Sequence, residues 1–143
     1  MEIESIDKII ANLLRIYETR DPFKLAKEKN VIVIEKDLGD IYGFYTRLRN
    51  VKVIYINSKL SWQDKILACA HELGHSVLHP AANTPHLSAA SITSELKIEK
   101  EANYFATRLI VDGSHDDHGI NNTYSILNYY GLPIEFERFL KKS

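Results

Sequence analysis

Cysteine is nearly absent from the sequence: Cys69 is the only one, so no disulfide can form within the chain. Disulfides are typical of secreted proteins, whereas a reducing cytoplasm keeps thiols free. The first residues, Met1 to Glu4, lack the basic stretch and the apolar run of a signal peptide. No segment approaches the roughly 18 consecutive apolar residues of a membrane span. We therefore expect a cytoplasmic protein that does not bind a membrane.

An excess of positive charge is also lacking. Lys and Arg total 18 against 19 Asp and Glu, so the net charge is -1. Surfaces that bind nucleic acid usually show a clear basic excess, so direct binding to DNA is disfavoured. The sequence contains no internal repeat and no low-complexity linker. Its length suits a single domain over residues 1–143, long enough to fold without a disulfide or a structural metal.

What the sequence does contain is a succession of helical, strand and again helical patterns. Ser61 and Asp64 resemble a capping box at the start of a long helix, which Pro80 ends. The order of the elements favours an α+β fold with a small antiparallel sheet of about three strands. The predicted helices are 3–17, 22–28, 61–79, 94–111, 124–130 and 134–140, the predicted strands are 31–35, 42–48 and 51–56, and the intervening loops include 81–93 and 113–122.

The strongest chemical signal lies in the helix that begins after Ser61. His71 and His75 are four residues apart and therefore lie on one helix face, one turn from each other. Two imidazoles at this spacing can bind one Zn²⁺. Glu72 follows the first histidine, which completes the H-E-x-x-H pattern of zinc metalloproteases. The alternative is a solvated helix face that carries two ordinary histidines.

A catalytic zinc needs a third protein ligand and an open position for water. A metzincin would continue with a glycine and a third histidine, but Leu78 and Ala81 occupy those positions. The remaining source is a carboxylate from the helix at 94–111. Helical phase places Glu99 closer than Glu101 to the apolar face of that helix. We therefore expect Glu99 to point inward and Glu101 to be a solvated surface carboxylate.

Two segments together resemble the ImmA/IrrE family of metallopeptidases. They are His71-Glu72-Leu73-Gly74-His75-Ser76-Val77-Leu78-His79 and Ile98-Glu99-Lys100-Glu101-Ala102-Asn103-Tyr104-Phe105-Ala106. The resemblance implies a single zincin-like domain whose zinc is held by His71, His75 and Glu99. It also implies that Asn103 orients a ligand histidine from outside the coordination shell. The family's stop after its second motif is missing here, because Leu109-Ile110-Val111-Asp112 follows instead.

Several other residues have more than one interpretation. His79 lies one turn beyond His75 and is too far from His71 to share its zinc, so we expect it behind a ligand or as a cation at the helix end. His86 is expected on the surface, and Cys69 is expected to be buried and not reactive. A glycine within a helix, Gly74, indicates close backbone approach near the metal. The segment 115–118 is expected to be a solvated acidic loop and not a weak metal site.

The pattern and the resemblance predict a zinc endopeptidase. Zn²⁺ polarises the scissile carbonyl and lowers the pKa of its bound water, while Glu72 is expected to serve as the catalytic base. The alternative is a binding module that contains a metal and sequesters a regulator without cutting it. Glu72 discriminates between the two, because a structural metal site has no use for a carboxylate beside an open coordination position.

The expected substrate is one specific protein, since an unrestricted protease would be harmful in the cytoplasm. The family resemblance implies a DNA-binding repressor of a mobile element. An extended segment of that partner is expected to pair along an exposed strand edge. The sequence favours Val51 to Asn57 for this role, because this segment directly precedes the active-site helix.

Overall fold

The computed structural model describes residues 2–140 and contains a three-stranded sheet together with helices. The α+β fold class expected from the sequence is confirmed. The elements are α1 (Ile3–Tyr17), α2 (Pro22–Glu28), β1 (Val31–Lys36), β2 (Gly43–Leu48), β3 (Val51–Asn57), α3 (Trp62–Leu78), the 3₁₀ helix η1 (Ala89–Thr93), α4 (Lys97–Ile110), α5 (Ser114–Asp117), α6 (Thr123–Tyr130), the 3₁₀ helix η2 (Ile134–Phe136) and α7 (Glu137–Leu140).

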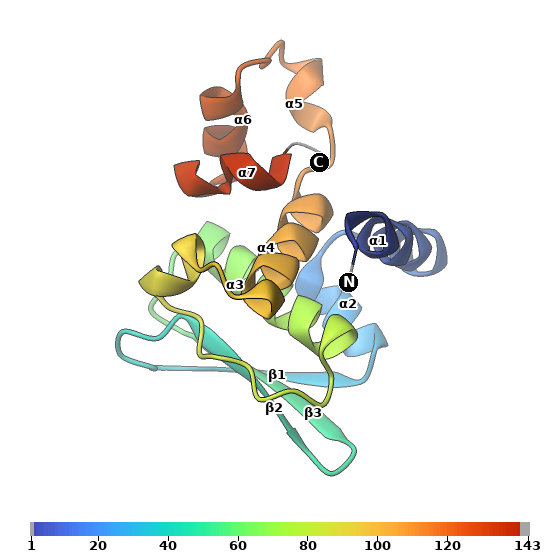
Figure 1. Cartoon of the computed structure of the whole chain (residues 1–143), viewed down its shortest axis with the longest axis vertical. Helices are drawn as coiled ribbons and strands as arrows, with labels where there is room; N and C mark the ends of the chain where they lie inside the picture. Colours follow the sequence, from blue (N-terminus) through green and yellow to red (C-terminus); the bar gives the residue numbers. More distant parts are fainter. Residues whose placement is uncertain (1, 141–143) are drawn as a thin grey trace.

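The strands lie together at one end of the molecule, with α3 and α4 between them and the C-terminal helices. Figure 1 shows the sheet at the bottom of the view, α3 and α4 above it, and α5, α6 and α7 at the top. Two fully buried side chains of β3, Ile54 and Ile56, contribute to the core. The helix α3 contacts α4 as well as β2 and β3, and is therefore central to the fold.

The sheet is mixed and not wholly antiparallel, which corrects one detail of the prediction. The strand order is β1-β3-β2, with β2 and β3 antiparallel and β1 and β3 parallel. The two connections between the strands each reverse the chain, so β1 and β3 run in the same direction. The strand β3 follows β2 in the chain but lies between β1 and β2 in the sheet. The parallel pair of β1 and β3 therefore forms without a helix in the connection.

The expectation that Val51–Asn57 offers an exposed strand edge is wrong. This segment is β3, the central strand, and its main chain is paired on both sides. The free edges belong to β1 and β2. Part of the β2 edge is also occupied, because Leu87 accepts a hydrogen bond from the Tyr42 amide at 2.8 Å and donates one to the Gly43 carbonyl at 2.9 Å. A partner segment therefore has no access to the main chain of β3.

The helix α3, which carries His71 and His75, begins and ends where its sequence predicts. The Ser61 hydroxyl accepts a hydrogen bond from the Asp64 amide at 3.2 Å, which satisfies one of the free N–H groups of the first turn. The helix ends at Leu78, and Pro80 follows. Its segment 68–76 is buried along its whole circumference, because the sheet covers one side and α4 another. The burial extends to His71, Glu72 and His75.

The helix predicted at 94–111 starts three residues later than expected, at Lys97. Ser94 ends η1 with an extended backbone, Leu96 is also extended, and α4 begins at Lys97. The segment 81–93 is accordingly not all loop, because Ser88 and Ser91 form a reciprocal capping box that starts η1. Likewise, α5 lies within the expected loop 113–122. Glu95 therefore lies outside α4.

The glycine in α3 marks the contact between α3 and α4. A Cβ on Gly74 would lie 3.1 Å from Cδ1 and 3.2 Å from Cγ of Phe105. The close approach predicted at this position is therefore made by an aromatic ring of α4. Cys69, also in α3, is fully buried and its burial raises the pKa of the thiol, as expected of a core residue.

Within residues 2–140, none of the helices combines the length and the apolar character that crossing a lipid bilayer requires.

We expect Gly74→Val to lower the free energy of unfolding by about 1–3 kcal/mol, because the added atoms overlap the Phe105 ring in a packed interface. Urea unfolding followed by circular dichroism measures the change. The substitution should cost less when Phe105 is first shortened to Leu. If the two changes add within about 0.5 kcal/mol, the Phe105 contact is not the reason for glycine at this position.

Candidate metal centre

The two histidines of the H-E-x-x-H pattern lie side by side on α3. The ring centroids of His71 and His75 are 4.7 Å apart, and both side chains are fully buried. A regular helix is the cause of this arrangement, because residues i and i+4 project from the same face. Their Nε2 atoms point towards α4, where the carboxylate of Glu99 meets both of them.

Glu99 closes the third side of the site. Its Oε1 lies 2.9 Å from Nε2 of His75, and its Oε2 lies 3.3 Å from Nε2 of His71. The side chain is 1% exposed, in agreement with the helical phase that directs it inward. The carboxylate and the two imidazoles come from two helices, so the packing of α3 against α4 determines whether they meet.

The electrostatics of this triad favour a cation. Burial alone would raise the pKa of Glu99, but its contacts with the imidazole rings of His71 and His75 outweigh burial and lower the pKa to about 2. Burial lowers the pKa of His75 to about 4, so its ring is neutral at neutral pH. For His71, burial opposes ionisation, but contact with Glu99 and the charge of Glu72 raise the pKa overall. The site thus combines an ionised carboxylate with imidazole nitrogens.

Glu72 is completely buried, and its carboxyl group has no hydrogen-bond partner among residues 2–140. Neither Oε1 nor Oε2 of its carboxyl group makes a hydrogen bond within the described part of the chain, and the residue is 0% exposed. Burial raises the pKa of this carboxyl group to about 8. Buried polar atoms without partners are rare and costly in native proteins. A buried carboxyl group without a partner therefore indicates a position where a ligand binds beside it.

Asn103 holds His71 from behind. Its Oδ1 lies 2.7 Å from Nδ1 of His71, and its Nδ2 donates a hydrogen bond of 3.0 Å to the main-chain carbonyl of Ser91. The Ser91 contact fixes which way the amide of Asn103 faces, so Oδ1 accepts the proton on Nδ1. The Nε2 atom of His71 is then left with its lone pair directed towards Glu99. Sequence reasoning did not identify Ser91, because only the fold brings η1 to α4.

His79 and Glu101 form a second contact behind the site. Nδ1 of His79 lies 3.0 Å from Nδ1 of His75, and Nε2 of His79 lies 2.8 Å from Oε1 of Glu101. The expectation that Glu101 is a solvated surface carboxylate is wrong, since the residue is 8% exposed. The periodicity of α4 does not reveal this, because α1 and the end of α3 cover the flank of α4 that carries Glu101.

The donor set fits a metal ion. Within residues 2–140, His71, Glu72 and His75 form a group whose possible ligand atoms all lie within 4.8 Å of one another. Nε2 of His71 and Oε2 of Glu99 are buried without a hydrogen-bond partner among the described residues, and both face the same position. Nitrogen and carboxylate ligands of this kind suit zinc. A divalent cation between them would satisfy these atoms at once.

The other histidines singled out in the sequence lie elsewhere. His86 stacks on Phe44 with centroids 4.6 Å apart. His115 contacts the Tyr130 hydroxyl through Nδ1 at 2.8 Å, and its Nε2 is 3.8 Å from Asp116. No group of three metal-binding side chains forms at 115–118 within the described residues. A cavity of about 420 Å³ between α1, α4 and α7 does not include the histidines in its lining.

Comparisons with known proteins agree with this site. A family model described as IrrE N-terminal-like domain (Peptidase_M78) matches residues 26–135. The "Uncharacterized immunity region protein 2" of Bacillus phage phi105 is 40% identical over 107 residues, which is 74% of this chain and 68% of that protein. "Metallopeptidase ImmA" of Bacillus subtilis (strain 168) is 27% identical over 104 residues, or 71% of this chain and 60% of that protein.

The family match covers most of the chain. It runs from α2 to η2, and so it includes both α3 and α4 with the side chains that converge between them. The two relatives are matched over 60% to 68% of their own lengths. A metallopeptidase-like role follows from the family together with the buried His-Glu-His group. On these grounds, the chain belongs to the ImmA/IrrE family of peptidases.

Proposed function

We propose that this protein is a zinc-dependent endopeptidase in which His71, His75 and Glu99 hold the metal and Glu72 is the catalytic base. The observation that carries the proposal is the carboxyl group of Glu72, which is fully buried beside the two histidines and has no partner among the described residues. A purely structural metal site would gain nothing from such a group, and its burial would only cost stability.

The zinc, when bound, would supply Lewis acidity that polarises the scissile carbonyl and makes water a competent nucleophile near neutral pH. The residues of the chain supply the rest. Glu72 would accept a proton from the attacking water and later deliver it to the nitrogen of the leaving amine. Asn103 would keep His71 oriented through the 2.7 Å contact with its Nδ1 atom. The sheet and α4 bury His71, Glu72 and His75, and a cavity of about 240 Å³ is lined by His71 and Asn103.

A second candidate function is a binding module that keeps its metal but does not cut. The complete burial of His71, Glu72 and His75 favours this candidate, since the cavity of about 240 Å³ that is lined by His71 and Asn103 is small for a peptide. Under this alternative the protein would sequester a regulator. The two functions differ in whether Glu72 matters for anything beyond folding.

We further propose that the substrate is one specific regulatory protein, a DNA-binding repressor of a mobile element, and that cleavage occurs in the cytoplasm. The support for this substrate is the similarity to a protein whose name places it in a phage immunity region. Deep burial of the site also suits a protease that acts only on a docked partner. The balanced charge of the chain gives no sign that it contacts DNA itself.

The parent protein is expected to bind one zinc per chain, and Glu99→Ala should weaken that binding sharply. Loss of a ligand should exceed the roughly 10–100-fold typical for a group outside the coordination shell. Competition with a chromogenic chelator measures the affinity. Glu95→Ala is the control, because Glu95 is an exposed acid that pairs with Lys100 and Arg138. Equal affinities in the two variants would mean that Glu99 is not a ligand.

Glu72→Gln is expected to retain zinc and to lose roughly 10²–10⁴-fold in the rate of cleavage, because an amide cannot take up the proton. Zinc content and cleavage of the same substrate are measured on one preparation. Cleavage at the parent rate would show that Glu72 is not the base. If the parent binds zinc but cuts no candidate substrate, including a repressor encoded beside it, the binding-module alternative is favoured.

The substrate proposal is tested by incubating the zinc-loaded protein with casein and, separately, with a repressor encoded beside its gene. We expect a single cut in the repressor and little or no digestion of casein, because a buried site excludes peptides that do not dock. Mass spectrometry locates the cut, and the Glu72→Gln variant is the control for contaminating proteases. Ready digestion of casein with an intact repressor would contradict the proposed specificity.

A further inference from the structure

We infer that Glu101 is a positioning residue for the metal: acting through His79, it holds His75 in the tautomer whose Nε2 lone pair faces the metal position. The inference rests on the proposed function, in which His75 is a zinc ligand. It assigns a role to Glu101 that neither the H-E-x-x-H pattern nor the helical phase of α4 indicates. It also explains why a carboxylate is buried on that side of α4.

Three contacts connect the carboxylates of Glu99 and Glu101 through two imidazole rings. Oε1 of Glu99 lies 2.9 Å from Nε2 of His75. Nδ1 of His75 lies 3.0 Å from Nδ1 of His79, and Nε2 of His79 lies 2.8 Å from Oε1 of Glu101. The side chains of His79 and Glu101 are 9% and 10% exposed, so bulk water has little access to the outer contact.

The direction of the hydrogen bonds follows from the carboxylate of Glu101. An ionised carboxylate only accepts hydrogen bonds, so Nε2 of His79 must carry a proton. In a neutral ring the other nitrogen, Nδ1 of His79, then has the lone pair and accepts from Nδ1–H of His75. The remaining nitrogen of His75, Nε2, is left as the acceptor that a metal requires.

Counting protons shows why this arrangement suits a metal ion. Two neutral imidazoles carry one N–H each, which satisfies two of the three contacts. The contact without a proton is the one between Nε2 of His75 and Oε1 of Glu99, where two acceptors face each other at 2.9 Å. Two facing acceptors repel, whereas a cation shared between them would be held by both. Glu101 thus determines which of the three contacts is left for the metal.

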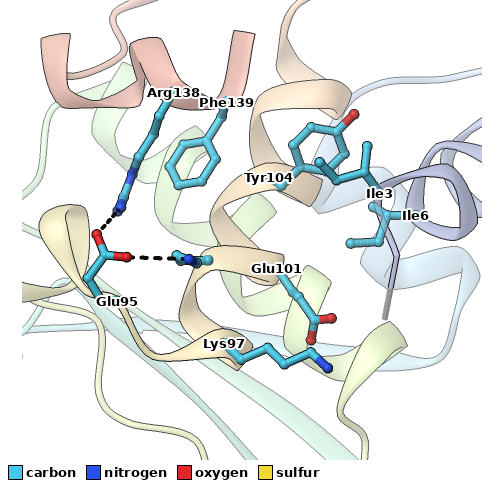
Figure 2. Close-up of a pocket in the computed structure, with 9 residues that line it drawn as sticks. Ile3, Ile6, Glu95, Lys97, Glu101, Tyr104, Arg138 and Phe139 are labelled. Carbon is cyan, nitrogen blue, oxygen red and sulfur yellow. Dashed lines mark hydrogen bonds and ion pairs between the residues drawn. The ribbon is translucent and has the colours of Figure 1, made fainter. Parts of the chain in front are cut away.

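The position of Glu101 is built into both helices. His79 ends α3, and its main-chain amide donates a hydrogen bond to the carbonyl of His75 at 2.8 Å, which keeps the two rings adjacent. Figure 2 shows Glu101 and Tyr104 on the side of α4 that faces Ile3 and Ile6 of α1. Glu101 thus lies where α1 meets α4, at the edge of the cavity between these helices and beside His79.

The outer nitrogen of the other proposed ligand histidine has a separate partner, so this histidine serves as an internal control. Nδ1 of His71 contacts the side-chain oxygen of Asn103, whose amide is oriented by Ser91. Within residues 2–140, Asn103 and Ser91 make no hydrogen bond to His79 or Glu101. A change at Glu101 should therefore alter His75 and His79 and leave His71 as it is.

The test is nitrogen-15 NMR of the histidine rings in the zinc-loaded protein, combined with zinc affinity measured by chelator competition. In the parent we expect His79 to carry its proton on Nε2, and His71 and His75 on Nδ1. Glu101→Met keeps the size of the side chain and removes the acceptor. We expect it to shift the signals of His79 and His75, to spare those of His71, and to weaken zinc binding by roughly 10–100-fold.

Glu101→Gln keeps an acceptor oxygen and is expected to restore the parent pattern and most of the affinity. Glu95→Met is the matched control, because Figure 2 shows Glu95 on the other side of α4, paired with Arg138. Observation of His79 with its proton on Nδ1 in the parent, or parent-like zinc affinity of Glu101→Met, would overturn the inference while leaving the zinc site standing. A parent protein that binds no zinc would overturn the proposed function itself.

Discussion

The packing of α3 against α4 is the interaction on which the site depends. The two histidines of α3 need only a regular helix to lie side by side, but Glu99 reaches them only when α4 crosses close by. Gly74 permits that approach, since any larger residue would meet the Phe105 ring. The same crossing brings Asn103 to His71 and Glu101 to His79. One helix contact therefore assembles every group proposed to hold the metal.

Burial of these polar side chains costs free energy, and the position of the cost points to a functional site. Charged and polar side chains seldom lie in a protein interior without partners. Here Asn103 and Glu101 contact the outward ring nitrogens of His71 and His79, and the Ser91 carbonyl accepts from Asn103. Atoms of Glu72 and Glu99 that face inward have no hydrogen-bond partner among the described residues. Together with Nε2 of His71, these unsatisfied atoms lie around the position proposed for zinc. Unsatisfied polar atoms at the centre, surrounded by side chains whose hydrogen bonds are satisfied, are typical of a site that binds a ligand.

Local features of the fold could be predicted from the sequence, whereas features that depend on distant contacts could not. The spacing of His71 and His75 and the cap at Ser61 involve residues within one or two helical turns, and the structure agrees with both. The central place of β3 depends on which strands pair, and the alternation of residues within one strand does not reveal that. The burial of Glu101 likewise depends on contacts of α4 with α1 and α3, and the spacing of apolar residues within α4 does not reveal those contacts.

The central claim is that His71, His75 and Glu99 share one zinc ion with Glu72 beside it. A crystal structure of the zinc-loaded protein, with anomalous scattering recorded at the zinc absorption edge, tests this most directly. We expect one anomalous peak per chain, with Nε2 of both histidines and a Glu99 oxygen at about 2.0–2.2 Å from the zinc. A zinc ion bound elsewhere, or one that has Glu101 as its ligand in place of Glu99, would contradict it.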